Sequence, residues 1–86
     1  MTNEEIALQE GTQTQLGTDI KMALFRVREG GDGEPPEVVV AVKDDREHKI
    51  TLHLGDTFPV GDQTWRLDRI ASAGGNRLGA VFTRIE

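Results

Sequence analysis

Histidine and serine are the residues of this chain that could act as a catalytic base or a nucleophile. The two histidines, His48 and His53, are five positions apart, so in one extended strand they point to opposite faces. They cannot bind one metal ion together unless a bulge lies between them. A catalytic base also needs a nucleophile within hydrogen-bond reach, and the only serine, Ser72, lies in a predicted loop. The pattern predicts no catalytic residue.

Carboxylates in pairs could perform acid–base chemistry, but here they fall where turns are predicted. Aspartate at a turn hydrogen bonds to nearby backbone groups, and this role is expected for Asp44, Asp45, Asp56 and Asp62. Three further carboxylates could offer oxygen ligands to Ca²⁺: Asp32, Glu34 and Glu37. Their spacing does not match a calcium-binding loop. We therefore expect no metal site.

Cofactor chemistry also lacks its usual residues. The chain has no cysteine, which removes thiolate catalysis, zinc–thiolate sites and iron–sulfur clusters. The glycine-rich residues 73–76 lack the lysine and the following helix of a phosphate-binding loop. The absence of disulfides and the acidic, polar first five residues, which do not resemble a signal peptide, favour a cytoplasmic protein. No cofactor is expected.

The charge of the chain bears on its partners. The net charge is −5, whereas nucleic-acid-binding proteins gain affinity from clustered Lys and Arg. Arginines concentrate in the last third of the chain and could form a local patch, although balancing acids are the simpler expectation: Arg66, Arg69, Arg77 and Arg84. The longest apolar run, residues 38–42, is too short to span a bilayer. Neither nucleic acid nor a membrane is expected as a partner.

Alternating apolar and polar residues, interrupted by glycine, predict that residues 1–86 form a single all-β domain. About seven hairpin-connected strands indicate a small antiparallel barrel or sandwich. Residues 29–37, rich in Gly, Pro and Glu, are expected to form a mobile loop. Because so short a chain without disulfides has a small core, self-association is a reasonable expectation.

Residues 20–28 are predicted to form a long strand, with a short helix as the alternative. The apolar positions begin on Ile20, Met22 and Leu24 and then change parity to Phe25 and Val27. A change of parity inside a strand indicates a bulge or a bend between two sheets.

The most detailed prediction is a hairpin with Gly61 and Asp62 in its two-residue turn. This register pairs Phe58 with Trp65 and Pro59 with Thr64, and it places four side chains on one face: Phe58, Val60, Trp65 and Leu67. Trp65 is therefore expected in the core, although a ligand-stacking role is the alternative. Pro59 would then turn its nitrogen away from the neighbouring strand and mark a sheet edge. Ile70 is out of phase with Leu67, which predicts a bulge near Asp68 or Arg69.

Residues 54–70, LGDTFPVGDQTWRLDRI, together with the preceding ITLH, resemble a group of short uncharacterised all-β proteins from actinobacteria. The resemblance is mainly to this hairpin, and the shared residues are structural in kind. It implies the fold and a bacterial cytoplasmic setting, and it brings no known activity.

These observations favour a non-enzymatic protein-binding module that acts through a sheet edge or face. The motivation is the absence of catalytic residues, together with an edge at Pro59 and the acidic segment 29–37. The alternative is a small-molecule-binding accessory protein of a biosynthetic pathway, which would require a cavity in the barrel.

Overall fold

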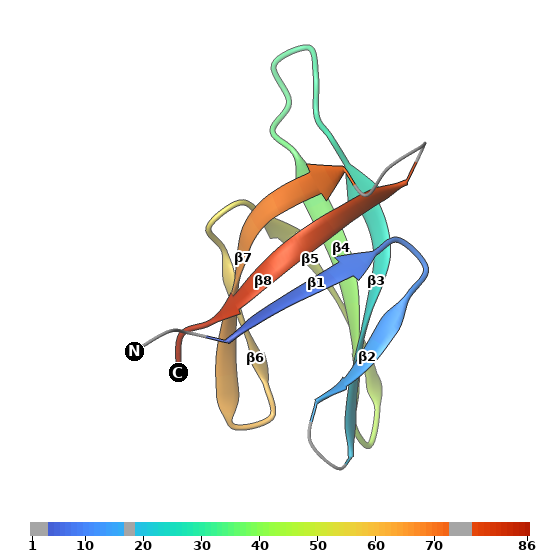
Figure 1. The fold of residues 1–86 in the computed structure, drawn as a ribbon, viewed down its shortest axis with the longest axis vertical. Coiled ribbons are helices and arrows are strands. Elements are labelled where there is room, and N and C mark those ends of the chain that lie inside the picture. The colour runs from blue at the N-terminus through green and yellow to red at the C-terminus, as the bar shows by residue number, and fades with distance from the viewer. Residues whose placement is uncertain (1–3, 17–18, 73–76) are drawn as a thin grey trace.

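A computed structural model describes residues 4–16, 19–72 and 77–86, and it contains two four-stranded antiparallel sheets packed against each other (Figure 1). The sheets do not close into a barrel, so of the two architectures predicted, barrel and sandwich, the sandwich is correct. Within these described residues there are eight strands, where about seven were expected: β1 (Glu5–Gln9), β2 (Gln13–Leu16), β3 (Ile20–Arg28), β4 (Glu37–Lys43), β5 (Glu47–His53), β6 (Thr57–Val60), β7 (Gln63–Ser72) and β8 (Leu78–Arg84). Sheet A has the order β1-β8-β7-β6, and sheet B has the order β2-β3-β4-β5.

Two glycine corners carry the chain from one sheet to the other. Between β1 and β2, Gly11 has a φ of 82° and donates its N–H to the carbonyl of Leu24. Between β5 and β6, Gly55 has a φ of 88° and donates to the carbonyl of Leu67. Such positive φ values suit glycine because it has no Cβ. The corners place β1 and β6 at the edges of sheet A and β2 and β5 at the edges of sheet B.

The core lies between the sheets and contains the apolar face predicted for the hairpin. Trp65 and Leu67 are fully buried, and Phe58 and Val60 are nearly so. Trp65 is therefore a core residue and not a ligand platform. The ring of Phe58 meets that of Phe82 edge to face, with the centroids 5.7 Å apart and the planes at 79°. This geometry is a favourable one for aromatic pairs.

The β6–β7 hairpin has the predicted register, with Phe58 opposite Trp65 and Pro59 opposite Thr64. Thr64 turns its backbone away from β6, because its N–H donates to the carbonyl of Glu86 and its carbonyl accepts from Ile85. The nitrogen of Pro59 therefore faces the free edge of β6, as predicted. The predicted bulge is also present, because the register of β7 against β8 shifts between Leu67 and Arg69.

Residues 20–28 form strand β3, so the helical alternative is wrong. The register against β4 shifts between Leu24 and Arg26, which confirms a bulge. The expectation that Phe25 joins Val27 on the buried face is wrong, since Phe25 is 55% exposed. A bulge sets two residues opposite one, and Phe25 is the additional residue that has no partner in β4.

One connection differs from the sequence-based expectation. Ser72 is the last residue of β7 and pairs with Leu78, so its assignment to a loop is wrong, because β7 resumes pairing after its bulge. Gly31 and Glu34 exchange two backbone hydrogen bonds at the tip of the β3–β4 hairpin, which projects beyond both sheets (Figure 1). The mobility expected for residues 29–37 stays a prediction. Residues 73–76 lie outside the described residues.

Candidate functional site

The two histidines lie in one regular strand, β5, with one on each face, so the structure does not bring them together. Nε2 of His53 lies 3.6 Å from a carboxylate oxygen of Glu37, and its Nδ1 lies 3.7 Å from Asp56. Nε2 of His48 lies 3.8 Å from Asp44. Each histidine therefore faces carboxylates, and neither can join the other at one site.

The aspartates of two turns have the structural roles expected of them. Asp56 accepts a hydrogen bond from the backbone N–H of His53 at 2.9 Å, across the corner between the sheets. Asp44 accepts one from the N–H of Arg46, also at 2.9 Å. This hydrogen bond, with a smaller contribution from the charge of His48, holds the pKa of the Asp44 carboxyl below its usual range.

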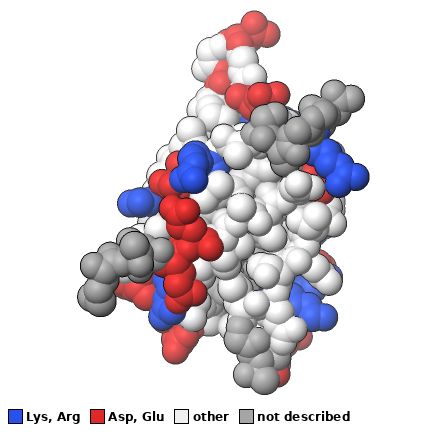
Figure 2. Space-filling model, in the orientation of Figure 1, with Lys and Arg blue, Asp and Glu red and all other residues white. Residues whose placement is uncertain are grey.

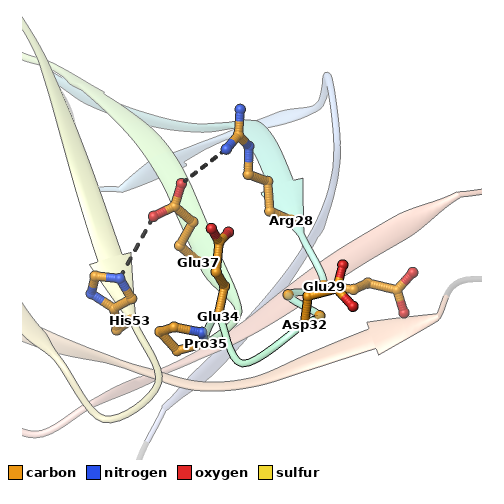
Figure 3. A pocket seen from close by; sticks show the side chains of 9 residues that line it. Arg28, Glu29, Asp32, Glu34, Pro35, Glu37 and His53 are labelled. Atoms are coloured by element: carbon orange, nitrogen blue, oxygen red, sulfur yellow. Dashed lines mark ion pairs between the residues drawn. The ribbon is translucent and has the colours of Figure 1, made fainter.

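A hollow of about 580 Å³ lies beneath the acidic tip of the β3–β4 hairpin (Figure 3). Three of the side chains that line it form a row, because Glu37 lies 3.8 Å from Arg28 and 3.6 Å from His53. The side chains of Glu29 and Asp32 point away from this row in Figure 3. Among the described residues, no group of three or more His, Asp or Glu side chains could hold a metal ion. Glu29, Asp32 and Glu34 also line the hollow, and none of these carboxylates lies within ion-pair distance of a basic group of the described residues. The one arginine of the lining, Arg28, is already paired.

The arginines of the last third of the chain are held mostly by acids. Arg66 and Arg69 pair with Asp68, and Arg84 pairs with Glu4 at 2.8 Å. On the side where β1, β7 and β8 lie in front, acidic and basic side chains lie beside one another along the left of the view (Figure 2). These arginines accordingly do not form a patch of one sign. The described segments also contain no helix that could cross a lipid bilayer.

Among the edge strands, β5 is the longest, with seven residues against five in β1 and four each in β2 and β6. An edge strand exposes backbone donors and acceptors that can pair with another chain. On β6 this is prevented at Pro59, which has no N–H to offer. β5 contains no proline, so its edge is open for pairing.

The hydrogen bonds identify which groups of β5 face outward. The N–H of His53 donates to the carboxylate of Asp56, and the carbonyl of His53 accepts from the N–H of Asp56. Both groups of His53 therefore point away from β4. In an antiparallel ladder, residues alternate between facing the neighbour and facing away. The N–H and C=O groups of Glu47, Lys49 and Thr51 therefore point to the free edge, whereas those of the residues between them bond to β4.

A second hollow, of about 510 Å³, adjoins this edge. Its apolar lining comes from both sheets: Val42 and Ile50 belong to sheet B, and Pro59 belongs to β6. Asp44, His48 and Lys49 also contribute to its lining. We call it the edge slot, because it lies between the edge strands β5 and β6. It could accept an apolar side chain from a strand that pairs with β5.

The outer face of sheet B carries an excess of positive charge. The register places five basic side chains on it, against the two carboxylates Glu37 and Glu47: Lys21, Arg26, Arg28, Lys43 and Lys49. Arg28 pairs with Glu37, and Lys43 lies 3.7 Å from Glu47. In the described part of the chain, no carboxylate lies within ion-pair distance of the other three. We call this surface the cationic face.

An exposed aromatic ring lies on the cationic face. The Nζ atom of Lys49 lies 4.4 Å from the centroid of the Phe25 ring, which is a cation–π contact. The register places three small or apolar residues on the same face: Ala23, Val39 and Ala41. The bulge in β3 is what exposes Phe25 here. A charged rim around an apolar, aromatic centre is a common composition for a protein-binding surface.

The cationic face was not identified from the sequence. The cations occupy alternate positions on β3, as in Arg26-Val27-Arg28, and this period-two pattern could have placed them on a solvated face. Lys49 is distant from them in the chain, so only the strand order brings it beside Phe25.

Comparison with known proteins gives a family and no activity. No match was found among curated proteins or among solved structures. The family model that matches covers residues 3–86, so the similarity extends well beyond the hairpin. The chain belongs to the DUF6406 family, a family of unknown function.

Proposed function

We propose that this protein is a non-enzymatic binding module that captures an extended segment of a partner protein along β5. The observation that carries the proposal is the open edge of β5, where three residues turn their backbone groups outward beside an apolar slot. Strand addition of this kind uses backbone hydrogen bonds for affinity and side-chain pockets for specificity.

The free energy of strand addition explains why the slot matters. Glu47, Lys49 and Thr51 can each exchange two hydrogen bonds with a residue opposite, and each bond contributes about 1 kcal/mol net. Ordering an extended segment costs about 1–2 kcal/mol per residue, so over five residues the two terms roughly cancel. Burial of one Leu or Val side chain in the edge slot adds about 1.5–3 kcal/mol. Affinity therefore depends on an apolar side chain at the inward positions.

The test is a proline substitution at the edge, Thr51→Pro. It removes an outward N–H and leaves the bonds to β4 intact, as Pro59 does on β6. A displayed library of short random peptides is selected on the wild-type protein, and the selected peptides are then measured against both proteins. We expect sequences with alternating apolar residues, and loss of their binding to Thr51→Pro. Equal binding to the two folded proteins would reject strand capture.

The proposal carries further expectations about the setting. The partner is a protein segment, with self-association as the competing outcome, and neither nucleic acid nor a lipid surface is involved. The resemblance of residues 54–70 to actinobacterial proteins supports a bacterial, cytoplasmic setting. Light scattering of the pure protein distinguishes a monomer, which strand capture from a partner requires, from a stable oligomer.

A further inference from the structure

We infer that the cationic face of sheet B is a docking surface for an acidic polypeptide segment. The inference goes beyond strand capture, because it concerns side chains on the outer face of the sheet instead of backbone groups at its edge. One partner could use both surfaces, since Lys49 belongs to β5 and also lies over Phe25. The two ideas can nevertheless fail separately.

The first argument is the contrast between this face and the rest of the molecule. The whole chain has a net charge of −5, yet five basic side chains and only two acidic ones share this face. Complementary charge steers a partner toward a surface and disfavours partners of the wrong sign. On sheet A the corresponding arginines are already paired with acids. The attraction for an acidic segment is therefore concentrated on sheet B.

The second argument is that two cations of this face lie where they repel each other. Lys21 and Lys43 lie directly opposite each other on neighbouring strands. Like charges in this position destabilise a sheet. Lys43 has Glu47 nearby, whereas Lys21 has no carboxylate within ion-pair distance among the described residues. A partner carboxylate placed between the two ammonium groups would relieve this repulsion.

The third argument identifies the polyanion as a polypeptide. Single-stranded nucleic acid binds basic surfaces by stacking its bases on exposed aromatic rings. Here the ammonium of Lys49 lies over the Phe25 ring at 4.4 Å, so this face of the ring is not open to a base. A carboxylate can contact the same ammonium from its outer side without displacing it. The acidic remainder of the protein also repels a long polyanion more than a short segment.

A second copy of the chain fits this face less well. If two β5 strands paired antiparallel about a two-fold axis, both outer faces would lie on the same side of one continuous sheet. The two cationic faces would then be neighbours, and Lys21, Arg26 and Lys49 would gain no acidic partner beyond the Glu47 of the second copy. An acidic segment of another protein supplies the missing charge.

The experiment measures binding of a fluorescent glutamate-rich peptide at low and physiological salt. The test variant is Lys21→Glu with Arg26→Glu, and the control is Arg66→Glu with Arg69→Glu, which makes the same change of charge on sheet A. We expect the test variant to bind at least about tenfold more weakly, the control to stay within about threefold of the wild type, and binding to weaken with salt. A milder variant, Arg26→Gln, serves if the double reversal does not fold.

Several results would overturn the inference. Equal losses in the two double variants would mean that only net charge matters, and absence of binding to the wild type would remove the docking surface. Tighter binding of a single-stranded oligonucleotide of equal charge would assign the face to nucleic acid. Thr51→Pro separates the proposals: if it loses the library-selected peptides while the glutamate-rich peptide never binds the wild type, strand capture stands and the docking inference falls.

Discussion

Proline substitutions along β5 test the assignment of its outward and inward backbone groups. Thr51→Pro removes an N–H that faces the free edge, whereas His48→Pro removes one that bonds to β4. The side chains of both residues are exposed, so neither substitution removes a core contact. The main difference between the two substitutions is therefore the backbone hydrogen bond, because the only side-chain ion pair that His48→Pro removes is the exposed one with Asp44.

The expected magnitudes differ because a proline in a paired position removes a ladder bond and also distorts the strand. We expect His48→Pro to lower the free energy of unfolding by about 3 kcal/mol, because the unpaired acceptor left in β4 and the strained backbone cost about 1–3 kcal/mol each. For Thr51→Pro we expect a loss of less than about 1 kcal/mol, as for a substitution at an exposed surface position. For a domain of this size, about 1 kcal/mol corresponds to about 4–8 °C in Tm. His48→Pro should therefore melt at least about 10 °C below the wild type.

The assay is urea and thermal unfolding followed by the fluorescence of Trp65, whose indole is fully buried in the folded protein. The control is the wild-type protein, and each protein is measured at two concentrations, so that a contribution of self-association appears as a concentration-dependent midpoint. Equal destabilisation by the two prolines, or a larger loss in Thr51→Pro, would refute the assigned alternation of β5. The edge on which strand capture depends would then be wrongly placed.

Three other substitutions test features away from β5. Pro59→Thr gives the edge of β6 a donor, so we expect the mass measured by sedimentation to rise with concentration; a strict monomer would show that Pro59 does not protect this edge. Gly79→Ala places a Cβ 2.6 Å from the carbonyl oxygen of Leu8, so we expect the free energy of unfolding in urea to fall by about 1–3 kcal/mol. An unchanged urea midpoint would contradict this close approach of β1 and β8. Asp44→Ala removes the acceptor for the N–H of Arg46. Because folding lowers the pKa of Asp44, its ionised carboxylate stabilises the folded protein fully above about pH 4, and this stabilisation is lost as the pH falls through the lowered pKa. The urea midpoints of the wild type and the variant should therefore differ at pH 7 and converge in strong acid. A difference that stays constant with pH would exclude this linkage.

The β6–β7 hairpin could be predicted in detail because its signals are local. A two-residue turn fixes the register, and alternation then decides which side chains are buried. Gly61 has a φ of 63°, as this turn position requires, and the predicted pairing of Phe58 with Trp65 follows from it. The bulge in β7 was predictable for the same reason, because it changes the phase of the apolar residues within one strand.

Phe25 shows what alternation alone cannot decide. A change of phase in β3 indicates that an additional residue is present, but it does not say which residue leaves the ladder. The sequence pattern assigned Phe25 to the buried face because it is large and apolar. In the structure the ladder skips Phe25 and keeps Val27 inward, since Val27 pairs with Val38 in the core. That choice depends on the partner strand, which the local sequence does not contain.

The cationic face and the edge slot could not be predicted, because both depend on the order of strands in space. The arginines that are numerous in the last third of the sequence do not make a basic patch, because Arg66, Arg69 and Arg84 lie beside acids in the fold. The cations without acidic partners come instead from two strands that are far apart in the chain and separated by β4. Local density of a residue type is thus a poor guide to a surface built from alternate residues of several strands.

The two free edges on either side of the slot are protected in different ways, and this difference supports a binding role for β5. On β6 the protection is Pro59, which removes a backbone donor and so blocks pairing with any partner. On β5 the protection consists of Glu47 and Lys49, charged side chains that discourage pairing with apolar strands. Charge leaves the backbone groups available to a partner of complementary charge, whereas proline does not. An edge that had only to avoid aggregation could have used either device, but an edge that selects a partner needs the one that β5 has.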